Sequence, residues 1–405
     1  MIRAATGIAV PILVLCLGHV FSNAVRTIPA MAADVLMRDL GLTAEALAQI
    51  TGAFPLAFAA VMIPVGIALD RFGVKRVALG LLTVAGCGAV LGAMATGPWS
   101  MLLAQVVLGA GCSGMLMCPI TFAARGLSTA RFAVWSGLIQ ALGNTGMLLS
   151  ASPLALLVEA LDWRAGFLAC AGIAALALPL VALLVPGDRP AAVPARSLGA
   201  DVREVARMAA QPALRGVMVF VFASFAAVLG LRGLWGGPWL MEGKGLDRVA
   251  AGNVLLACTV ALTVGPLLAG LVLRRVGHAR ALMAGSHLAC AVFILLIVGG
   301  GPGGWLAAML GLPMLPVAWD AVLLVLFGGI ISFQVLAFSI VRSAVPPEQA
   351  GRALSAANLF FFSGAAVFQA LSGAMAGWGG PSAALTTFAV GLLVCTLGFL
   401  ALRPR

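Results

Sequence analysis

Gly66-Ile-Ala-Leu-Asp-Arg-Phe-Gly-Val-Lys-Arg76 is a short basic segment between two long apolar runs. The pattern returns as Gly270-Leu-Val-Leu-Arg-Arg-Val-Gly-His-Ala-Arg280, again between two apolar runs. In each segment two glycines flank a pair of charged residues, which favours a tight turn. Because the two turns occupy the same point of each half, we interpret the chain as an internal duplication, a plan in which the binding site lies between the repeats.

The apolar runs around these turns indicate a membrane protein. Hydrophobic residues make up 62% of the 405 residues and charged residues 9%, whereas soluble chains carry about 25% charged residues. Runs of about 20 apolar residues, which can cross a bilayer as a helix, recur along the sequence. A barrel would instead show alternating segments of about ten residues. We predict twelve transmembrane helices, at 8–31, 47–69, 77–96, 100–123, 132–157, 165–185, 214–240, 249–273, 281–299, 319–341, 353–376 and 383–402.

Lysine and arginine lie almost entirely on one face of these helices. That face carries Arg3, Arg71, Lys75, Arg76, Arg125, Arg131, Arg189, Arg196, Arg203, Arg207, Arg215, Arg274, Arg275, Arg280, Arg342, Arg352, Arg403 and Arg405. The other face carries Arg38, Arg164, Lys244 and Arg248. The positive-inside rule therefore predicts a multi-pass protein of the cell inner (plasma) membrane with both termini in the cytoplasm. This asymmetry also explains the net charge of +11 without a nucleic-acid partner.

A polar segment divides the chain into two halves. It opens with Pro186-Gly187 and ends in a stretch with Leu198, Val202, Val205 and Met208 at near-helical spacing. Apolar residues at that spacing among charges predict a short helix on the membrane surface. We therefore expect a first six-helix bundle at 1–187, a cytoplasmic linker at 188–213, and a second six-helix bundle at 214–405.

The first turn resembles the loop between helices 2 and 3 of the Major Facilitator Superfamily, which reads roughly G-x-L-A-D-R-x-G-R-R. The matching residues are Gly66, Asp70, Arg71, Gly73, Lys75 and Arg76, with further matches at Asp162-Trp-Arg164 and Pro346-Pro-Glu348. The resemblance implies an all-α membrane fold of twelve helices in two pseudo-symmetric six-helix bundles. It also implies alternating access, with Gly66, Asp70, Arg71, Gly73 and Arg76 as a gating loop that latches against the start of helix 11. The alternative is that this loop only sets topology.

Two arginines lie inside predicted helices, Arg26 in the first and Arg232 in the seventh. A charge at the centre of a bilayer costs about 2.5 to 3.5 kcal/mol on insertion scales, so such a residue usually faces a cavity and meets a partner. Asp34 and Asp320 are predicted near span ends on the outer side, and no acid is predicted deeper. Because a guanidinium fork suits carboxylates and small oxyanions, we predict that both arginines bind an anionic substrate. Snorkelling of their long stems to the interface is the alternative.

Other polar residues are candidates for the same site. His19 and Asn23 share a helical stripe with Arg26, and His19 could also couple transport to protons. The remaining candidates are Gln140 and Asn144 in helix 5, Gln334 in helix 10 and Asn358 in helix 11. Each could bind a substrate or tie two helices together.

The sequence predicts transport of a small anion or organic acid. Asn23-Ala-Val-Arg-Thr-Ile-Pro29 is similar to the end of helix 1 in the cyanate and nitroimidazole permease branch of the superfamily. Many drug/proton antiporters of the family carry an arginine in helix 4 where this chain has Gln105, and a different glycine pattern at 143–153. Proton-coupled multidrug or metabolite efflux is therefore the alternative, and a membrane sensor or scaffold is a third.

We expect no enzyme activity, cofactor or metal site. The sequence shows no His/Cys/Asp/Glu cluster with metal-ligand spacing, and the eight cysteines lack CxxC spacing. The expected partners are a small anionic molecule and the lipid bilayer, and we expect a monomer. Protons and a counter-transported anion both remain open as coupling partners, and so does the direction of transport.

Overall fold

A computed structural model describes residues 2–26, 28–42, 44–149, 157, 160–187, 198–346 and 349–402, and the described elements are all helices. By their internal contacts the residues form two compact units. Unit 1 comprises Met1–Phe132, Ile139–Ala206 and Val345–Ala356, and unit 2 comprises Ala133–Leu138, Arg207–Ala344 and Ala357–Arg405. The boundaries between the units fall inside three helices, α8 (Thr129–Leu149), α11 (Leu198–Ala210) and α19 (Ala350–Ala401), and between Ala344 and Val345.

Unit 1 holds the helices of the first half. They are α1 (Ile2–Val25), α2 (Ile28–Met31), α3 (Ala33–Leu40), α4 (Ala44–Phe72), α5 (Val74–Ala93), α6 (Pro98–Cys112), α7 (Met117–Gly126), most of α8 (Thr129–Leu149) and α10 (Trp163–Leu184). Small residues let several of them approach closely. A Cβ on Gly111 of α6 would lie 2.5 Å from the backbone nitrogen of Ala85 on α5, so only glycine fits there.

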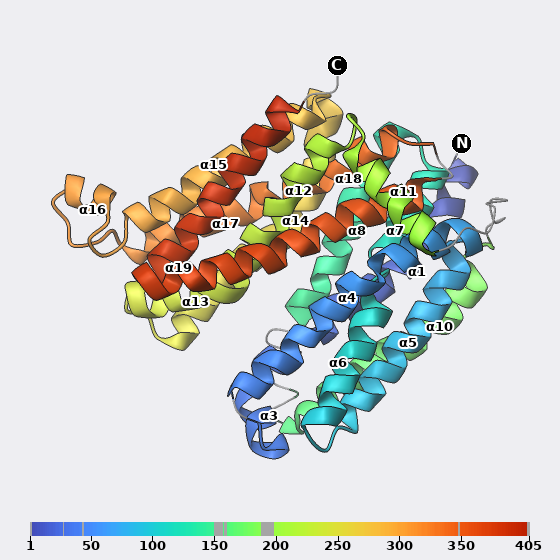
Figure 1. Cartoon of the computed structure of the whole chain (residues 1–405), viewed down its shortest axis with the longest axis horizontal. Coiled ribbons are helices and arrows are strands. Elements are labelled where there is room, and N and C mark those ends of the chain that lie inside the picture. Colours follow the sequence, from blue (N-terminus) through green and yellow to red (C-terminus); the bar gives the residue numbers. More distant parts are fainter. Residues whose placement is uncertain are drawn as a thin grey trace. The chain divides into compact units, whose positions relative to one another are not determined.

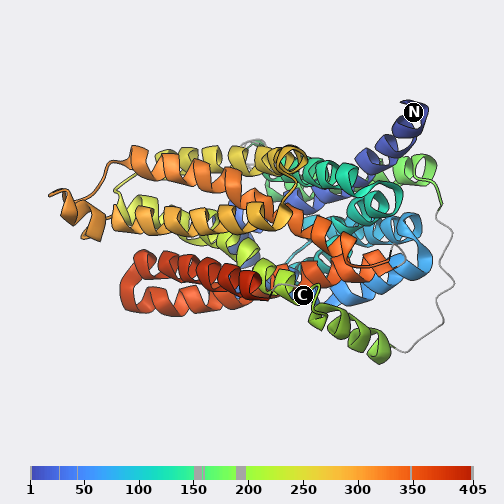
Figure 2. The same ribbon diagram turned by 90° about the horizontal axis from the view of Figure 1, so that it is seen from above.

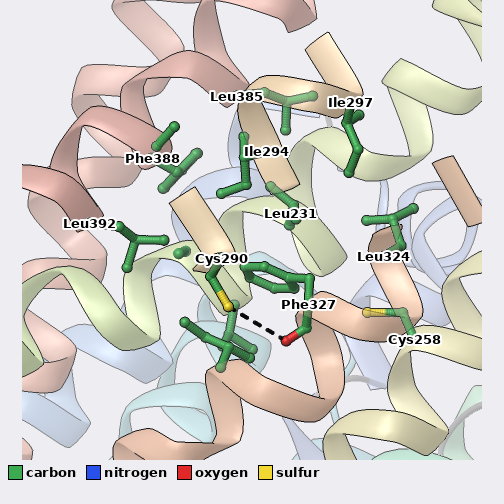
Figure 3. Close-up of a cluster of buried hydrophobic side chains, with 14 of the residues drawn as sticks. Leu231, Cys258, Cys290, Ile294, Ile297, Leu324, Phe327, Leu385, Phe388 and Leu392 are labelled. Carbon is green, nitrogen blue, oxygen red and sulfur yellow. Dashed lines mark hydrogen bonds between the residues drawn. The ribbon is translucent and has the colours of Figure 1, made fainter. Parts of the chain in front are cut away.

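Unit 2 holds the helices of the second half (Figures 1 and 2). They are α12 (Arg215–Val228), the π-helix η1 (Leu229–Trp235), α13 (Gly236–Pro238), the π-helix η2 (Trp239–Gly243), α14 (Arg248–Val276), α15 (Ala279–Gly299), α16 (Trp305–Met309), α17 (Val317–Ile331), the 3-10 helix η3 (Ser332–Val335), α18 (Leu336–Ser343) and most of α19 (Ala350–Ala401). Their core is a cluster of buried apolar side chains, which Figure 3 shows around Phe327 and Phe388. In that core the Cys290 thiol donates to the Phe327 carbonyl at 3.8 Å.

The helices agree with the predicted membrane spans in most places. Within the described residues ten helical segments are long and apolar enough to cross a membrane, and the last, which is α19, covers two predicted spans. Gly379 and Gly380 leave the helical conformation in the middle of α19, with φ of +64° at Gly380, so the chain turns back there and its two arms diverge from the bend (Figure 1). The predicted span 132–157 corresponds to α8 and to residues partly outside the described ranges. Twelve helices in two bundles stays a prediction.

Two boundaries differ from the sequence expectation. Helix 1 ends at Val25 and not at residue 31, and a separate short helix, α2, covers Ile28–Met31. Arg26 therefore lies in the turn that follows α1 and not inside it. The predicted helix 214–240 is α-helical only to Val228 and continues as η1, where the poor helix formers Gly230 and Gly233 stand.

The linker forms the helix that its spacing predicts. This helix, α11, covers Leu198–Ala210, while residues 188–197 before it lie outside the described ranges. All eight cysteines are free thiols and most are buried, as expected for small apolar residues.

Candidate functional site

The first turn places a buried carboxylate against two arginines of unit 1. Asp70 stands near the end of α4 with its side chain fully shielded from solvent. Arg125 Nη2 donates to Asp70 Oδ1 at 2.9 Å and to the Leu69 carbonyl at 3.1 Å. The backbone nitrogen of Arg352, at the start of α19, donates to Asp70 Oδ2 at 3.2 Å, and Arg352 Nε lies 3.3 Å from that oxygen. The carboxylate therefore joins the ends of α4 and α7 to the start of α19.

Glycines make this contact sterically feasible. A Cβ on Gly66 would lie 2.7 Å from Ser355 Cβ and 3.4 Å from the Gly351 carbonyl, both on α19. Gly73 ends the turn with φ of +79°, a conformation that side-chain-bearing residues rarely adopt. Of the basic residues in the turn, Arg71 and Lys75 are half-buried and Arg76 is exposed. In the predicted gating loop, Asp70 makes the ionic contact, Gly66 allows α4 to approach α19, and Gly73 adopts the backbone conformation of the turn.

The second turn also packs closely against a neighbouring helix, but it has no acidic residue at the position of Asp70. A Cβ on Gly270 of α14 would lie 2.8 Å from the Ala133 carbonyl and 2.9 Å from Val134 Cα, both on α8 within unit 2. Arg274 stands where the first turn has Asp70, and it is exposed. Arg280 ends this turn by donating to the Phe399 carbonyl at 2.8 Å.

A polar network joins α1 to α8 in unit 1. Gln140 Nε2 lies 3.4 Å from His19 Nε2 and donates to Asn144 Oδ1 at 3.0 Å. Asn23 Nδ2 donates to the Gly143 carbonyl at 2.8 Å. A Cβ on Gly143 would overlap the His19 ring, so the glycine lets the imidazole lie directly on α8. Four residues predicted for the site are thus neighbours, and at least two of their bonds tie helices together.

The two predicted arginines differ in their surroundings. Arg26 is half-buried in the turn after α1. Arg232 is half-buried in η1 of unit 2, and its Nε donates to Thr259 Oγ1 at 2.8 Å. Thr259 is 3% exposed and donates in turn to the Leu255 carbonyl at 2.8 Å, which fixes its orientation.

Gln334 and Asn358 also belong to unit 2. Gln334 lies in η3, and its Oε1 is buried with no hydrogen-bond partner among the described residues. Asn358 is 3% exposed and lies on α19. Among the described contacts neither is bonded to Arg232.

A buried ion pair in unit 2 was missed from the sequence. Lys244 Nζ lies 2.9 Å from Asp320 Oδ2, and both side chains are fully buried. Trp239 Nε1 donates to Asp320 Oδ1 at 2.8 Å, and Lys244 Nζ donates to the carbonyls of Gly300 and Leu315 at 2.9 and 3.0 Å. The sequence placed Asp320 near an outer span end. Asp320 lies in the first turn of α17, near the start of that helix, and what the sequence did not indicate is its burial against the lysine and the indole.

The Asp162-Trp-Arg164 match has a structural explanation in unit 1. Asp162 caps α10 by accepting from the Ala165 nitrogen at 3.0 Å, and Arg164 lies 4.2 Å over the Trp163 ring. The Trp163 indole donates to Asp39 Oδ2 at 3.1 Å. The bond from Arg38, together with that from Trp163, lowers the pKa of the Asp39 carboxyl, which lies outside the membrane spans. These contacts anchor α3 to α10.

Comparison with known proteins establishes the family. The model of the Major Facilitator Superfamily matches residues 15–368, so the chain belongs to this superfamily of membrane transporters. Three solved structures share the fold. They are the Escherichia coli fucose:proton symporter (TM-score 0.76, 14% identity, 99% of this chain and 100% of the other), a human organic anion transporter (0.77, 15%, 98% and 99%) and a proton:xylose symporter (0.76, 13%, 97% and 95%). The protein is therefore a multi-pass membrane transporter and not an enzyme by family and fold.

Curated relatives differ in what they transport. A multidrug resistance protein B homolog of Mycobacterium tuberculosis is 31% identical over 182 residues, which are 44% of this chain and 33% of the relative. A probable sulfoacetate transporter of Cupriavidus necator is 25% identical over 285 residues, 66% of each chain. A cephamycin export protein of Amycolatopsis lactamdurans is 29% identical over 182 residues, 43% of this chain and 36% of the relative. The chain thus matches about a third of the multidrug and cephamycin relatives, and the cyanate and nitroimidazole branch is not among these relatives.

Proposed function

We propose that this transporter moves a small anion or organic acid across the cell inner membrane by alternating access. The observation that carries the proposal is the environment of Arg232. Its Nε binds the neutral Thr259, and among the described residues no carboxylate pairs with it. A guanidinium inside a membrane usually meets a partner, and its free edge can bind a carboxylate or sulfonate through two parallel hydrogen bonds.

Arg26 is proposed as the second anion-binding residue. It directly follows α1, whose residues His19 and Asn23 contact α8, where Gln140 and Asn144 lie. These four, together with Gln334 and Asn358 of unit 2, are proposed to contact the substrate. His19 is proposed as the proton-coupling residue, with exchange for a second anion as the other coupling mode.

The loop at Gly66, Asp70, Arg71, Gly73 and Arg76 is proposed as the gate. Asp70 holds the start of α19 through Arg352, and this contact is proposed to break each time the cytoplasmic side opens. The proposal includes twelve membrane helices in bundles at 1–187 and 214–405, with the linker at 188–213. It also includes a monomer with both termini in the cytoplasm.

Ligand-induced thermal stabilisation of the purified protein tests the anion proposal. Acetate, sulfoacetate and sulfate are compared with tetraphenylphosphonium, a lipophilic cation. We expect at least one organic anion to raise Tm by several degrees, and Arg232→Ala and Arg26→Ala to abolish that rise. Arg274→Ala is the matched control, because Arg274 is exposed on the second turn. Anion binding that neither site variant changes would refute the site.

Proton-coupled drug or metabolite efflux is the second candidate. Similarity to a multidrug resistance protein homolog and to a cephamycin export protein favours it. Stabilisation by tetraphenylphosphonium alone, with proton-driven extrusion of it from proteoliposomes, would replace the anion proposal by this one.

A further inference from the structure

The connection between α15 and α17 is apolar along its whole length. Residues 300–316, which we call the α16 hairpin, contain the short helix α16 and carry no charged, hydroxyl or amide side chain. Connections between helices usually run over the surface and are polar. In unit 2 this hairpin projects beyond the ends of α15 and α17 (Figures 1 and 2). Its composition is therefore that of a membrane segment, although it lies outside the spans.

Hydrogen bonds fix the base of the hairpin. The Leu315 nitrogen donates to the Gly300 carbonyl at 2.8 Å, which joins the two strands of the connection. Lys244 Nζ donates to the carbonyls of the same two residues. Nearer the tip, the Leu312 nitrogen donates to the Ala307 carbonyl at 3.0 Å. The hairpin is thus a defined element that holds its tip away from the rest of unit 2.

The tip presents large apolar side chains that unit 2 does not bury. Trp305 is 53% exposed and Met309 is 76% exposed. Leu310, Leu312 and Met314 are exposed as well. Single exposed apolar residues are common on proteins, whereas a contiguous group of them marks a surface that contacts another phase or molecule. The tip of the hairpin is such a group.

The position of the hairpin identifies this contact as lipid. With 21 residues, α15 is about 31 Å long, which matches the hydrocarbon core of a bilayer. Since α15 begins at the basic turn 270–280, the hairpin lies at the opposite surface of the bilayer. Exposed apolar residues continue from it along the spans, at Val292 of α15 and at Val322 and Leu326 of α17. Tryptophan is enriched at this depth of a membrane protein.

We infer that the tip of the α16 hairpin inserts into the interfacial layer of the bilayer, where lipid headgroups meet the acyl chains. There it anchors the adjoining ends of α15 and α17. This inference does not depend on the substrate of the transporter. Interfacial helices commonly combine an apolar face with Lys and Arg that attract anionic lipids. Because the hairpin carries no charge, its insertion needs apolar contact alone and proceeds equally in zwitterionic lipid.

Fluorescence quenching of Trp305 in nanodiscs of phosphatidylcholine tests the inference. The difference between the full-length protein and its Trp305→Phe variant gives the Trp305 signal. Lipids brominated near the headgroup are expected to reduce this signal at least twofold, and lipids brominated near the chain ends to reduce it less. The matched control is Trp163, measured in the same way with Trp163→Phe, because its side chain is fully buried and shielded from lipid. Adding anionic phosphatidylglycerol should leave the Trp305 quenching unchanged.

Three results would overturn the inference. A Trp305 signal quenched by brominated lipid no more than that of Trp163, but quenched by iodide, would place the tip in water. A signal quenched by neither would show a protein covering the tip, and cross-linking would then identify a second copy. Stronger quenching by the deeper bromines would place the tip in the hydrocarbon core. The double variant Trp305→Phe/Met309→Trp repeats the measurement at the most exposed side chain of the hairpin.

Discussion

The two turns at 66–76 and 270–280 share their backbone design and differ in charge. Gly66 lets α4 approach α19 in unit 1, and Gly270 lets α14 approach α8 in unit 2. Asp70 of the first turn is buried between two arginines, whereas Arg274 of the second is exposed. Close packing of helices is therefore common to both turns, whereas the buried ionic contact of Asp70 belongs to the first turn. The steric requirement is thus common to both turns, whereas their electrostatics differ.

The largest difference in transport between the two turns is expected when the charge of Asp70 is removed. Asp70→Asn removes the negative charge that faces Arg125 and Arg352, so the start of α19 loses its ionic partner. We expect transport in proteoliposomes to fall more than tenfold while expression and membrane insertion persist. Arg274→Ala at the matching position should leave transport within twofold. Unchanged uptake by the Asp70→Asn protein would contradict the gating proposal.

Unit 2 has a buried ion pair of its own, between Lys244 and Asp320. Removing one member strands the other charge, so Lys244→Met should destabilise unit 2 by about 3 to 5 kcal/mol. The double variant Lys244→Met/Asp320→Leu should recover much of this loss, because it buries no unpaired charge. Thermal unfolding of the single and double variants measures both effects. A double variant no more stable than Lys244→Met would mean that packing by these side chains outweighs their charge.

Substitution of the close-packed glycine in either turn is expected to destabilise the protein by a smaller amount. A second substitution should relieve the clash in the first turn but not in the second. Ala at Gly66 or at Gly270 forces neighbouring atoms apart, at a cost of about 1 to 3 kcal/mol each. Gly66 meets the Ser355 side chain, so Ser355→Gly should relieve Gly66→Ala. Gly270 meets the backbone of Ala133 and Val134, where no side-chain truncation makes room. Tm values of the single variants and of Gly66→Ala/Ser355→Gly decide this, and rescue that fails would place the clash elsewhere.

Sequence reasoning reached the features that are local in the chain. The turns, most helix positions and the helix at 198–210 follow from apolar run length, glycine placement and spacing. The pairing of Lys244 with Asp320 and the bond from Arg232 to Thr259 join residues distant in sequence, which one sequence with no alignment cannot pair. The π-helical conformation at Leu229–Trp235 could not be predicted for another reason, since an α-helix and a π-helix across a membrane require the same apolar composition.

The smallest effect is expected when an acid is introduced into the second turn. Arg274→Asp gives the second turn the residue type that the first turn has at Asp70. Residue 274 is exposed, however, and the nearby Arg280 is already bonded to the Phe399 carbonyl. A surface carboxylate beside arginines gains little, because water screens the pair. We therefore expect no measurable change in Tm and transport within twofold of the parent. A change as large as that of Asp70→Asn would show that position, and not burial between two arginines, gives the acid of the first turn its effect.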